Sequence, residues 1–353
     1  MSAAATLPVV GALNSTERNV LIGLAVFFGL LFVSMLAGVI QPRYLFFLLS
    51  LAGMYVLLTM GLNVQWGYAG LINFSVAAFW GIGAYCAALV TASNSPLGLE
   101  LHPVFGLVAA VVVSALVAVL IGIPTLRLRE DYLAIATLGL AEVVRLLILN
   151  EEQWTNGSAG VSGIPRLFEG LPFDSVIRNF YVVLGLIVVV YLFLRRVHQS
   201  PWGRVLRTIR ADEDLAEALG KDTYAFKMQA FVLGSVIMAA AGVFYVHLNL
   251  YLGPDDLEPI QTFYVWIAVI LGGTGSNRGA MIGGLTVVAI LEGTRFLNTA
   301  VIPAGVDVAP LRLLFVGLLI ILVIRYREEG LLPPQHELVA GGVADEKGGG
   351  PDE

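Results

Sequence analysis

The 353-residue sequence contains little charge and a single cysteine. Lys, Arg, Asp and Glu make up 13% of its residues, whereas soluble globular proteins carry about 25%. So few polar side chains cannot cover a water-facing surface of this size, which nearly excludes a soluble enzyme. The single cysteine, Cys86, rules out an intramolecular disulfide and argues against a cysteine-based metal site.

Motifs that would supply chemistry or energy are also missing. The four histidines show no metal-ligand spacing, so we expect no metal site and no cofactor. No phosphate-binding run of Gly, four residues and Gly-Lys-Ser/Thr is present, so the chain does not bind ATP through a P-loop. Energy for any active transport must therefore come from a gradient or another subunit. The net charge of −6 argues against nucleic acid as a partner.

Apolar residues, by contrast, make up 58% of the chain and fall in long blocks. Backbone polar groups in lipid must be satisfied within each segment, and these blocks do not alternate as barrel strands do. We therefore predict an all-α polytopic membrane protein of about ten transmembrane helices, some of them short or re-entrant. The predicted spans are 19–40, 44–62, 74–92, 104–125, 132–149, 179–197, 228–250, 260–273, 279–297 and 311–326.

Lys and Arg are distributed unevenly between the two sides of this arrangement. The loop 198–227 and its flanks hold seven of them, and placing that loop in the cytoplasm puts fourteen of the twenty on the cytoplasmic side. Both termini then lie in the cytoplasm. We expect a tail at 1–18, a transmembrane domain at 19–326, and a disordered acidic, Gly-rich tail at 327–353.

Two pairs of opposite charges interrupt apolar segments at the same spacing. Glu142 and Arg145 lie in the fifth span, and Glu292 and Arg295 lie in the ninth. Residues three apart share one helix face, so each pair can neutralise itself and simply hold helices together. Because charge inside a membrane is costly and often functional, the pairs can equally form a polar wall of a substrate path. A zwitterionic substrate would find both signs at Glu142 and Arg145.

Glycines and amides break the apolar pattern between the second and third spans. The run 63–73 contains Asn63, Gly67, Gly70 and Asn73, and favours a broken or re-entrant backbone beside the substrate path. An ordinary tight turn with small packing positions is the alternative. The run 272–284 has a similar character, which hints at an internal repeat.

The loop 198–227 is too polar to span a membrane. Residues 212–219 favour a short helix, which the acids at its start stabilise and Gly220 ends. Such a helix suits docking to a partner on the cytoplasmic face, and a charged connector that only anchors topology is the alternative.

Several motifs resemble one transporter family. They are GLNVQWGYAGLINFS at 61–75 with 81–85, YLAIATL at 132–138 with 126–129 and 142–145, WTNGSAG at 154–160, the loop 203–220 ending in EALG, and GGTGS at 272–276 with Gly279 and Gly283. Together they are similar to the LivM-type branched-chain amino-acid permeases of ATP-binding-cassette (ABC) importers, and to their urea and amide relatives. Asn156 stands where the family commonly has Gly, and Leu219 where its cytoplasmic motif has a second Ala.

The resemblance implies a non-enzymatic subunit in the cell membrane. Its partners would be a LivH-like second permease, two cytoplasmic ATPases that hydrolyse ATP, and an external substrate-binding protein. The loop would be the helix that couples to the ATPase, through Arg204, Arg207, Asp214, Glu217, Ala218 and Gly220. Branched-chain amino acids are the expected cargo, with urea or short amides as the alternative. A gradient-driven secondary transporter without ATPases is the competing class.

Overall fold

The computed structural model describes residues 15–36, 38, 41–168, 174–301, 314, 317–318, 325 and 330–332. Most of the predicted tenth span, 311–326, lies outside these residues, as do most of the two predicted tails. The side chain of Arg295 also lies outside them, so the predicted Glu292–Arg295 pair is not described.

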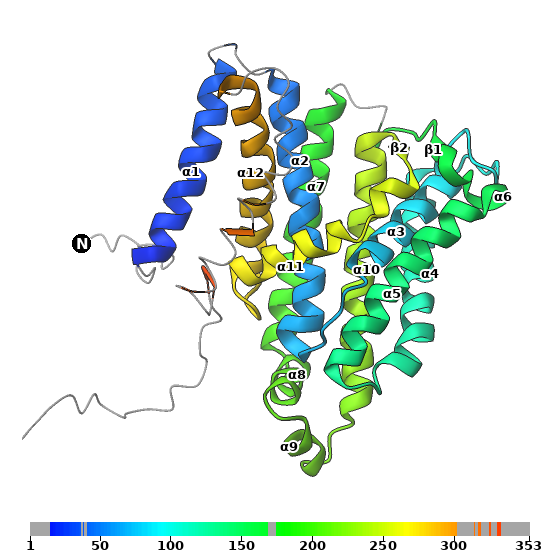
Figure 1. The fold of residues 1–353 in the computed structure, drawn as a ribbon, viewed down its shortest axis with the longest axis vertical. Helices are drawn as coiled ribbons and strands as arrows, with labels where there is room; N and C mark the ends of the chain where they lie inside the picture. Colours follow the sequence, from blue (N-terminus) through cyan, green and yellow to red (C-terminus); the bar gives the residue numbers. More distant parts are fainter. Residues whose placement is uncertain are drawn as a thin grey trace, which may run out of the picture.

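The described chain is mostly helical (Figure 1). The first nine predicted spans each coincide with a helix. The α-helices are α1 Ser15–Leu36, α2 Pro42–Leu62, α3 Val76–Thr91, α4 Pro103–Thr125, α5 Glu130–Asn150, α6 Glu152–Thr155, α7 Ser175–Gln199, α8 Pro201–Ala211, α9 Glu213–Ala218, α10 Thr223–Asn249, α11 Ile260–Gly272 and α12 Asn277–Val301. A π-helix, Asn63–Tyr68, continues α2, and the 3-10 helices are Gly157–Ala159 and Pro254–Leu257. The strands β1 Val161–Ser162 and β2 Tyr251–Leu252 pair antiparallel.

Five of the described helices are long and apolar enough to cross a membrane. They are α2 with its π-helical extension, α4, most of α5, α7 and α10. The apolar helices α3 and α11 are shorter, with 16 and 13 residues. The short eighth segment predicted from the sequence coincides with α11, which crosses the middle of the molecule in Figure 1.

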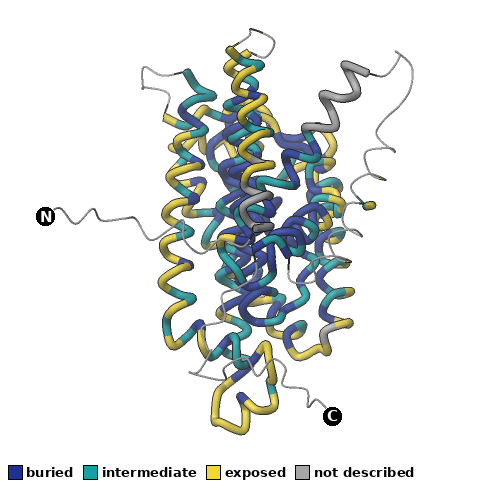
Figure 2. The backbone as a smooth tube through the Cα atoms, turned by 90° about the vertical axis from the view of Figure 1, so that its left-hand side faces the viewer, coloured by how far each residue is buried: buried dark blue, intermediate teal, exposed yellow. Residues whose placement is uncertain are grey.

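Burial separates central helices from peripheral ones. Of the apolar stretches, 78% of the one in α2 and 72% of the one in α10 is buried, against 22% in α4, 28% in α5 and 22% in α7. Figure 2 shows the same division, with dark buried backbone inside and exposed residues outside. The peripheral helices expose large apolar side chains such as Leu116, Leu120 and Val189. Such faces are stable only against lipid or a partner.

Small residues let the central helices approach closely. A Cβ at Gly242 of α10 would lie 2.0 Å from the carbonyl oxygen of Trp80 in α3, and one at Gly83 of α3 would lie 2.2 Å from that of Ala239 in α10. Backbone therefore meets backbone here, a packing mode that small residues permit in membrane helices. This contact fixes the position of Trp80 on α3.

The connection after α5 explains one departure from the family pattern. Asn156 adopts the left-handed conformation, with φ of 62°, that glycine adopts most easily. Asn is one of the few other residues that tolerate it. Its Nδ2 also donates to the carbonyl oxygen of Asn94 at 3.2 Å, so the loop keeps this turn without glycine.

Candidate functional site

The chain between α2 and α3 is irregular and yet buried. The π-helix ends at Tyr68, Gly70 has a φ of 73°, and the following residues return toward α3 without regular structure. Leu71, Asn73 and Ser75 are all buried. This arrangement agrees with the predicted broken backbone, because a tight surface turn would leave these residues exposed.

Buried amides hold this break in place. The Nε2 of Gln65 donates to the carbonyl oxygen of Phe231 in α10 at 2.8 Å, and its Oε1 accepts from Nδ2 of Asn73 at 2.6 Å. The carbonyl oxygen of Asn73 accepts from Nε1 of Trp266 in α11 at 2.9 Å. Buried polar groups are costly unless paired, and here the pairing ties the break to two other helices.

The two Gly-rich breaks found in the sequence meet in space. The backbone N–H of Gly275 donates to Oδ1 of Asn63 at 2.8 Å, and Nδ2 of Asn63 donates to Oδ1 of Asn277 at 3.3 Å. The hydroxyl of Tyr68 also donates to Oδ1 of Asn277, at 2.5 Å. The end of α2 is therefore joined to the start of α12. A Cβ at Gly67 would lie 2.1 Å from Oδ1 of Asn63 and 2.7 Å from the backbone nitrogen of Gly275, so a larger residue would push the two breaks apart.

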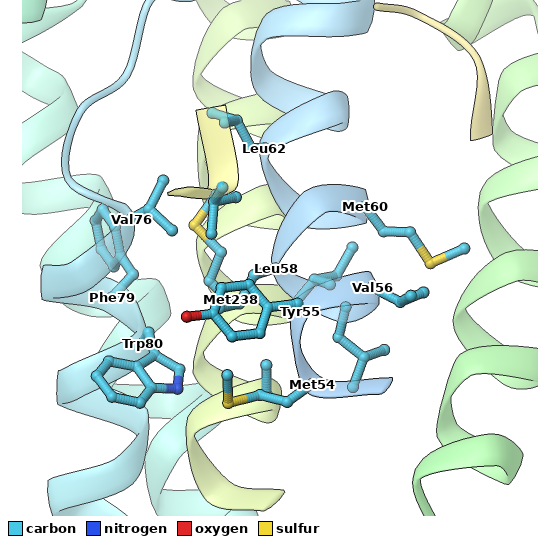
Figure 3. Close-up of a cluster of buried hydrophobic side chains, with 14 of the residues drawn as sticks. Met54, Tyr55, Val56, Leu58, Met60, Leu62, Val76, Phe79, Trp80 and Met238 are labelled. Atoms are coloured by element: carbon cyan, nitrogen blue, oxygen red, sulfur yellow. The ribbon is translucent and has the colours of Figure 1, made fainter. Parts of the chain in front are cut away.

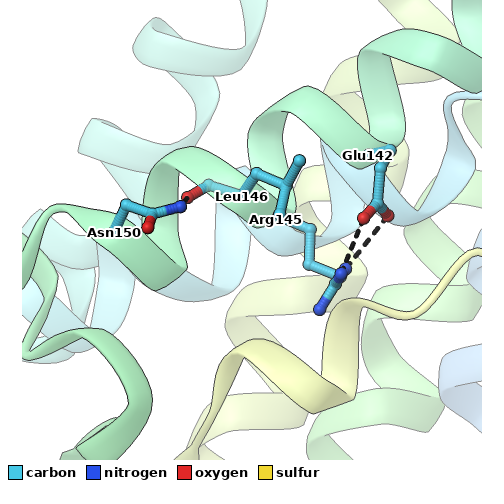
Figure 4. Close-up of polar contacts among 4 residues, drawn as sticks. All are labelled: Glu142, Arg145, Leu146 and Asn150. Atoms are coloured by element: carbon cyan, nitrogen blue, oxygen red, sulfur yellow. Dashed lines mark hydrogen bonds and ion pairs between the residues drawn. The ribbon is translucent and has the colours of Figure 1, made fainter.

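Glu142 and Arg145 form the pair that their spacing predicts. Nε and NH2 of Arg145 donate to the two carboxylate oxygens of Glu142 at 3.0 and 2.6 Å (Figure 4). Their side chains are 38% and 21% exposed on α5, so the pair is only partly covered. Asp255 and Glu258 lie close enough to act electrostatically on Arg145.

The loop between α7 and α10 folds as two short helices at one end of the bundle (Figure 1). The side chain of Asp212 caps α9 by accepting from the backbone N–H of Leu215 at 2.9 Å. At the other end, the N–H groups of Gly220 and Lys221 donate to the carbonyl oxygens of Glu217 and Ala216, and Gly220 has a φ of 75°. These two hydrogen bonds form a Schellman motif. The predicted helix at 212–219 and its end at Gly220 are therefore confirmed.

The residues expected to couple to an ATPase differ in their surroundings. Asp214, Ala218 and Gly220 are exposed, and so are Leu215 and Leu219 beside them. Other members of the set hold the loop together. Arg204 and Arg207 donate to the carbonyl oxygens of Gln199 and His198 at 3.2 and 2.9 Å, and Glu217 accepts from the hydroxyl of Thr223 at 2.7 Å.

Arg210 links this loop to the break in α2. Its NH1 donates to the carbonyl oxygen of Gly67 at 2.5 Å. A Cβ at Gly275 would lie 2.9 Å from the same NH1, and one at Gly70 would lie 3.4 Å from Cγ of Arg210. Glycines of both breaks thus surround one arginine of α8. Arg210 was not among the residues predicted from the sequence, because the even spacing of Arg204, Arg207 and Arg210 does not reveal which one turns inward.

A cavity of about 210 Å³ lies between α2, α3, α10, α11 and α12. None of Asn63, Gly67, Gly70 and Asn73 lines it, and neither does Glu142 or Arg145. Figure 3 shows Tyr55 of α2, with its hydroxyl directed toward α3, opposite Trp80. The lining side chains are Leu51, Met54, Tyr55, Trp80, Tyr245, Gln261, Tyr264, Val288, Leu291 and Glu292.

Polar groups of this cavity come from five separate segments. The hydroxyl of Tyr55 donates to Oε1 of Gln261 at 2.7 Å, and Oε2 of Glu292 accepts from the hydroxyl of Tyr44 at 3.1 Å. Within the described part of the chain, the buried Nε1 of Trp80 has no hydrogen-bond partner. Only Glu292 of these residues was predicted from the sequence, since aromatic side chains from four separate helices carry no recognisable spacing.

Comparison with known proteins agrees with the motifs. A family model described as "Branched-chain amino acid transport system / permease component" matches residues 44–324. A LivM high-affinity branched-chain amino acid transport permease from Escherichia coli is 31% identical over 84% of this chain and 73% of its own length. A probable LivM permease from Methanocaldococcus jannaschii is 28% identical over 80% of this chain and 91% of its own length.

Permeases with the name LivH match as well. The one from Salmonella typhimurium is 27% identical over 73% of this chain and 90% of its own length. No solved structure matches the chain.

Proposed function

The chain belongs to the permease component family of branched-chain amino acid transport systems, a family of multi-pass membrane proteins, and we propose that it forms half of the pore of an ABC importer for branched-chain amino acids. The observation that carries the proposal is the α8–α9 loop. It exposes a capped helix at one end of the bundle and also reaches, through Arg210, into the break in α2. A permease powered by another subunit needs both features.

The second permease would be a LivH-like chain. This chain resembles proteins named LivM and proteins named LivH, which supports two related halves around one pore. The exposed apolar sides of α4, α5 and α7 offer faces for lipid and for that partner. Two ATPases would supply the energy, since the chain has no P-loop of its own.

We orient the α8–α9 end toward the cytoplasm, with both termini on that side and about ten spans in all. The excess of Lys and Arg in the loop 198–227 supports this orientation. The opposite end carries the acidic residues Glu151, Glu152, Asp255 and Glu258, which suit an external substrate-binding protein.

Coupling would run from α9 through α8 to the breaks. Leu215 and Leu219 would enter a cleft of the ATPase, with Asp214 and Ala218 at its rim and Gly220 shaping the end of the helix. Arg204, Arg207 and Glu217 would keep the loop rigid enough to transmit a push. Arg210 would pass that movement to Gly67, and so to the joined ends of α2 and α12.

The substrate path would begin at the cavity, on the side of the breaks away from α8 and α9. Asn63, Gly67, Gly70 and Asn73 would close the path below the cavity, and alternating access would open it there. Glu142 and Arg145 would form a polar wall near the outer end of α5. Their partial exposure and bidentate contact support a role beyond helix packing.

The test is uptake by proteoliposomes that contain the complex purified from its native membrane. We expect an ATPase and a second permease to co-purify, and leucine uptake to require ATP and to resist competition by urea. Uptake by this chain alone, driven by an ion gradient, would instead favour a secondary transporter. Competition by urea or a short amide would reassign the cargo.

A single variant tests the role of the loop. Glu217→Arg removes the bond to Thr223 and reverses a charge on α9. We expect it to abolish uptake while membrane insertion and assembly of the permease pair persist. Normal uptake by this variant would remove α9 from the coupling route.

A further inference from the structure

We propose that the cavity between α2, α3, α10, α11 and α12 is a binding site for a zwitterionic α-amino acid within the permease itself. Glu292 would hold the ammonium group, the indole N–H of Trp80 would donate to the carboxylate, and an apolar wall would hold the side chain. This inference rests on the proposed transport function. It goes further, because it gives the pore its own selectivity.

Trp80 supplies the first observation. Its residue is only 3% exposed and it lines the cavity, yet its Nε1 has no partner among the described residues. Buried N–H groups are nearly always hydrogen-bonded, so a vacant donor at a cavity wall indicates an absent acceptor. The ring is held rigidly, since it packs edge-on against Tyr245 at 4.8 Å between centroids and its backbone contacts Gly242. A carboxylate is the acceptor that gains most from such a donor.

Glu292 supplies the opposite charge. Its carboxylate lies in the cavity wall beside Val288 and Leu291, on the same helix. The hydroxyl of Tyr44 donates to Oε2, which orients the group, and a carboxylate can accept several further hydrogen bonds. A carboxylate forms its strongest hydrogen bonds with charged donors. An ammonium group is such a donor, whereas urea carries no charge to offer.

One part of the wall is apolar, and the volume is small. Leu51, Met54, Val288 and Leu291 provide aliphatic and thioether surface. The volume of 210 Å³ equals the liquid volume of roughly seven water molecules, which suits one small amphipathic molecule. Methionine adapts its shape to different aliphatic groups, so Met54 can accept leucine, isoleucine and valine in turn.

Binding is tested on the complex of permeases and ATPases, purified without the external binding protein. The probes for calorimetry are L-leucine, 4-methylpentanoate, which lacks the ammonium, isoamylamine, which lacks the carboxylate, and urea. We expect leucine to bind and each of the other three to bind at least tenfold more weakly. Equal binding of 4-methylpentanoate or isoamylamine would overturn the two-point recognition.

Variants locate the binding site. Glu292→Gln and Trp80→Phe should each weaken leucine binding at least tenfold and raise the KM of uptake while kcat changes less. The matched controls Glu100→Gln and Trp154→Phe alter exposed residues outside the cavity and should leave both values unchanged. Leucine affinity unchanged in Glu292→Gln and Trp80→Phe would refute the proposed site even if uptake continues. Absence of ATP-dependent amino-acid uptake in the wild-type complex would instead refute the proposed function.

A labelling experiment does not depend on loss of function. Cys86 is the only cysteine, so Cys86→Ala provides a thiol-free permease chain into which Leu51→Cys places one reporter in the cavity wall. Leucine should slow the reaction of this thiol with a small maleimide, and urea should not. A labelling rate that leucine does not change would overturn the proposal.

Discussion

Replacing Arg210 tests whether α8 moves the breaks. Arg210→Met keeps the aliphatic stem and removes the guanidinium, whose NH1 lies 2.5 Å from the carbonyl oxygen of Gly67. Partial desolvation lowers the pKa of Arg210 below its ordinary value, but arginine stays protonated at neutral pH. The variant therefore removes a charge-assisted hydrogen bond between the loop and the end of α2.

The size of the effect follows from this bond. A hydrogen bond that involves a charged group contributes about 1.5–3 kcal/mol to the contact between its partners. Since 1.4 kcal/mol corresponds to about a tenfold change in an equilibrium, the coupling between α8 and the break should weaken by roughly tenfold to a hundredfold. Hydrolysis in the ATPases does not involve this bond and should continue.

The assay is the number of leucine molecules taken up per ATP hydrolysed by proteoliposomes. We expect this ratio to fall at least tenfold in Arg210→Met and to recover in part in Arg210→Lys, which keeps a charged donor. Arg195→Met is the matched control, because Arg195 is an exposed arginine at the end of α7 and should keep the wild-type ratio. An unchanged ratio in Arg210→Met would refute the coupling route.

Misfolding is separated from uncoupling by a second variant. Gly275→Ala leaves Arg210 in place but puts a Cβ 2.9 Å from its NH1, and it also strains the backbone because Gly275 has a φ of 89°. It should also lower the ratio, and the amount of assembled complex reports on folding in both variants. A fall in uptake that only follows a fall in assembled complex would show that Arg210 is structural.

Three further predictions concern packing, charge and pH. Gly242→Ala should lower the free energy of unfolding by about 1–3 kcal/mol, since the new Cβ meets the backbone of Trp80. Thermal unfolding should show no such loss for the control Gly185→Ala, where nothing lies within 4 Å of the new Cβ. Arg145→Leu should raise the KM of uptake or prevent folding, because it leaves Glu142 unpaired. The double variant Glu142→Gln, Arg145→Gln should fold and still transport, with a raised KM. A normal KM in the double variant would show that the pair is purely structural. The backbone N–H of Val176 and the guanidinium of Arg43 hold the pKa of Asp174 below its ordinary value. Asp174 therefore stabilises α7 fully at pH values above its unfolded pKa of about 4. This stabilisation is lost as the pH falls through the lower pKa that Asp174 has in the folded protein. Thermal midpoints of Asp174→Ala and wild type should converge across that acidic range, and a constant difference would refute this origin.

Patterns along the chain predicted much of the helical architecture. Apolar runs such as 104–125 and 228–250 identified helices because a membrane requires continuous apolar, internally bonded segments. Gly220 and the acids before it predicted the ends of α9, since capping depends on neighbours in sequence. The contact between Glu142 and Arg145 followed in the same way from one helical turn.

Contacts between distant segments could not be predicted in this way. Nothing near Asn63 indicates that it binds Gly275, and nothing near Arg210 indicates that it reaches Gly67. The predicted path residues Asn63 and Asn73 are fully buried and hydrogen-bonded within the protein, whereas the cavity lies elsewhere. Their place on the path remains a prediction.

The membrane-protein class, the positions of nine helices, the polar loop with its capped helix and the family could be predicted from the sequence, because each depends on composition or on residues close in the chain. Three features required the folded molecule: which helices are central, the meeting of the two Gly-rich breaks around Arg210, and the cavity that five segments enclose beside Trp80 and Glu292. Burial and hydrogen-bond partners depend on distances in space, and close packing between helices brings together residues as far apart as 63 and 277.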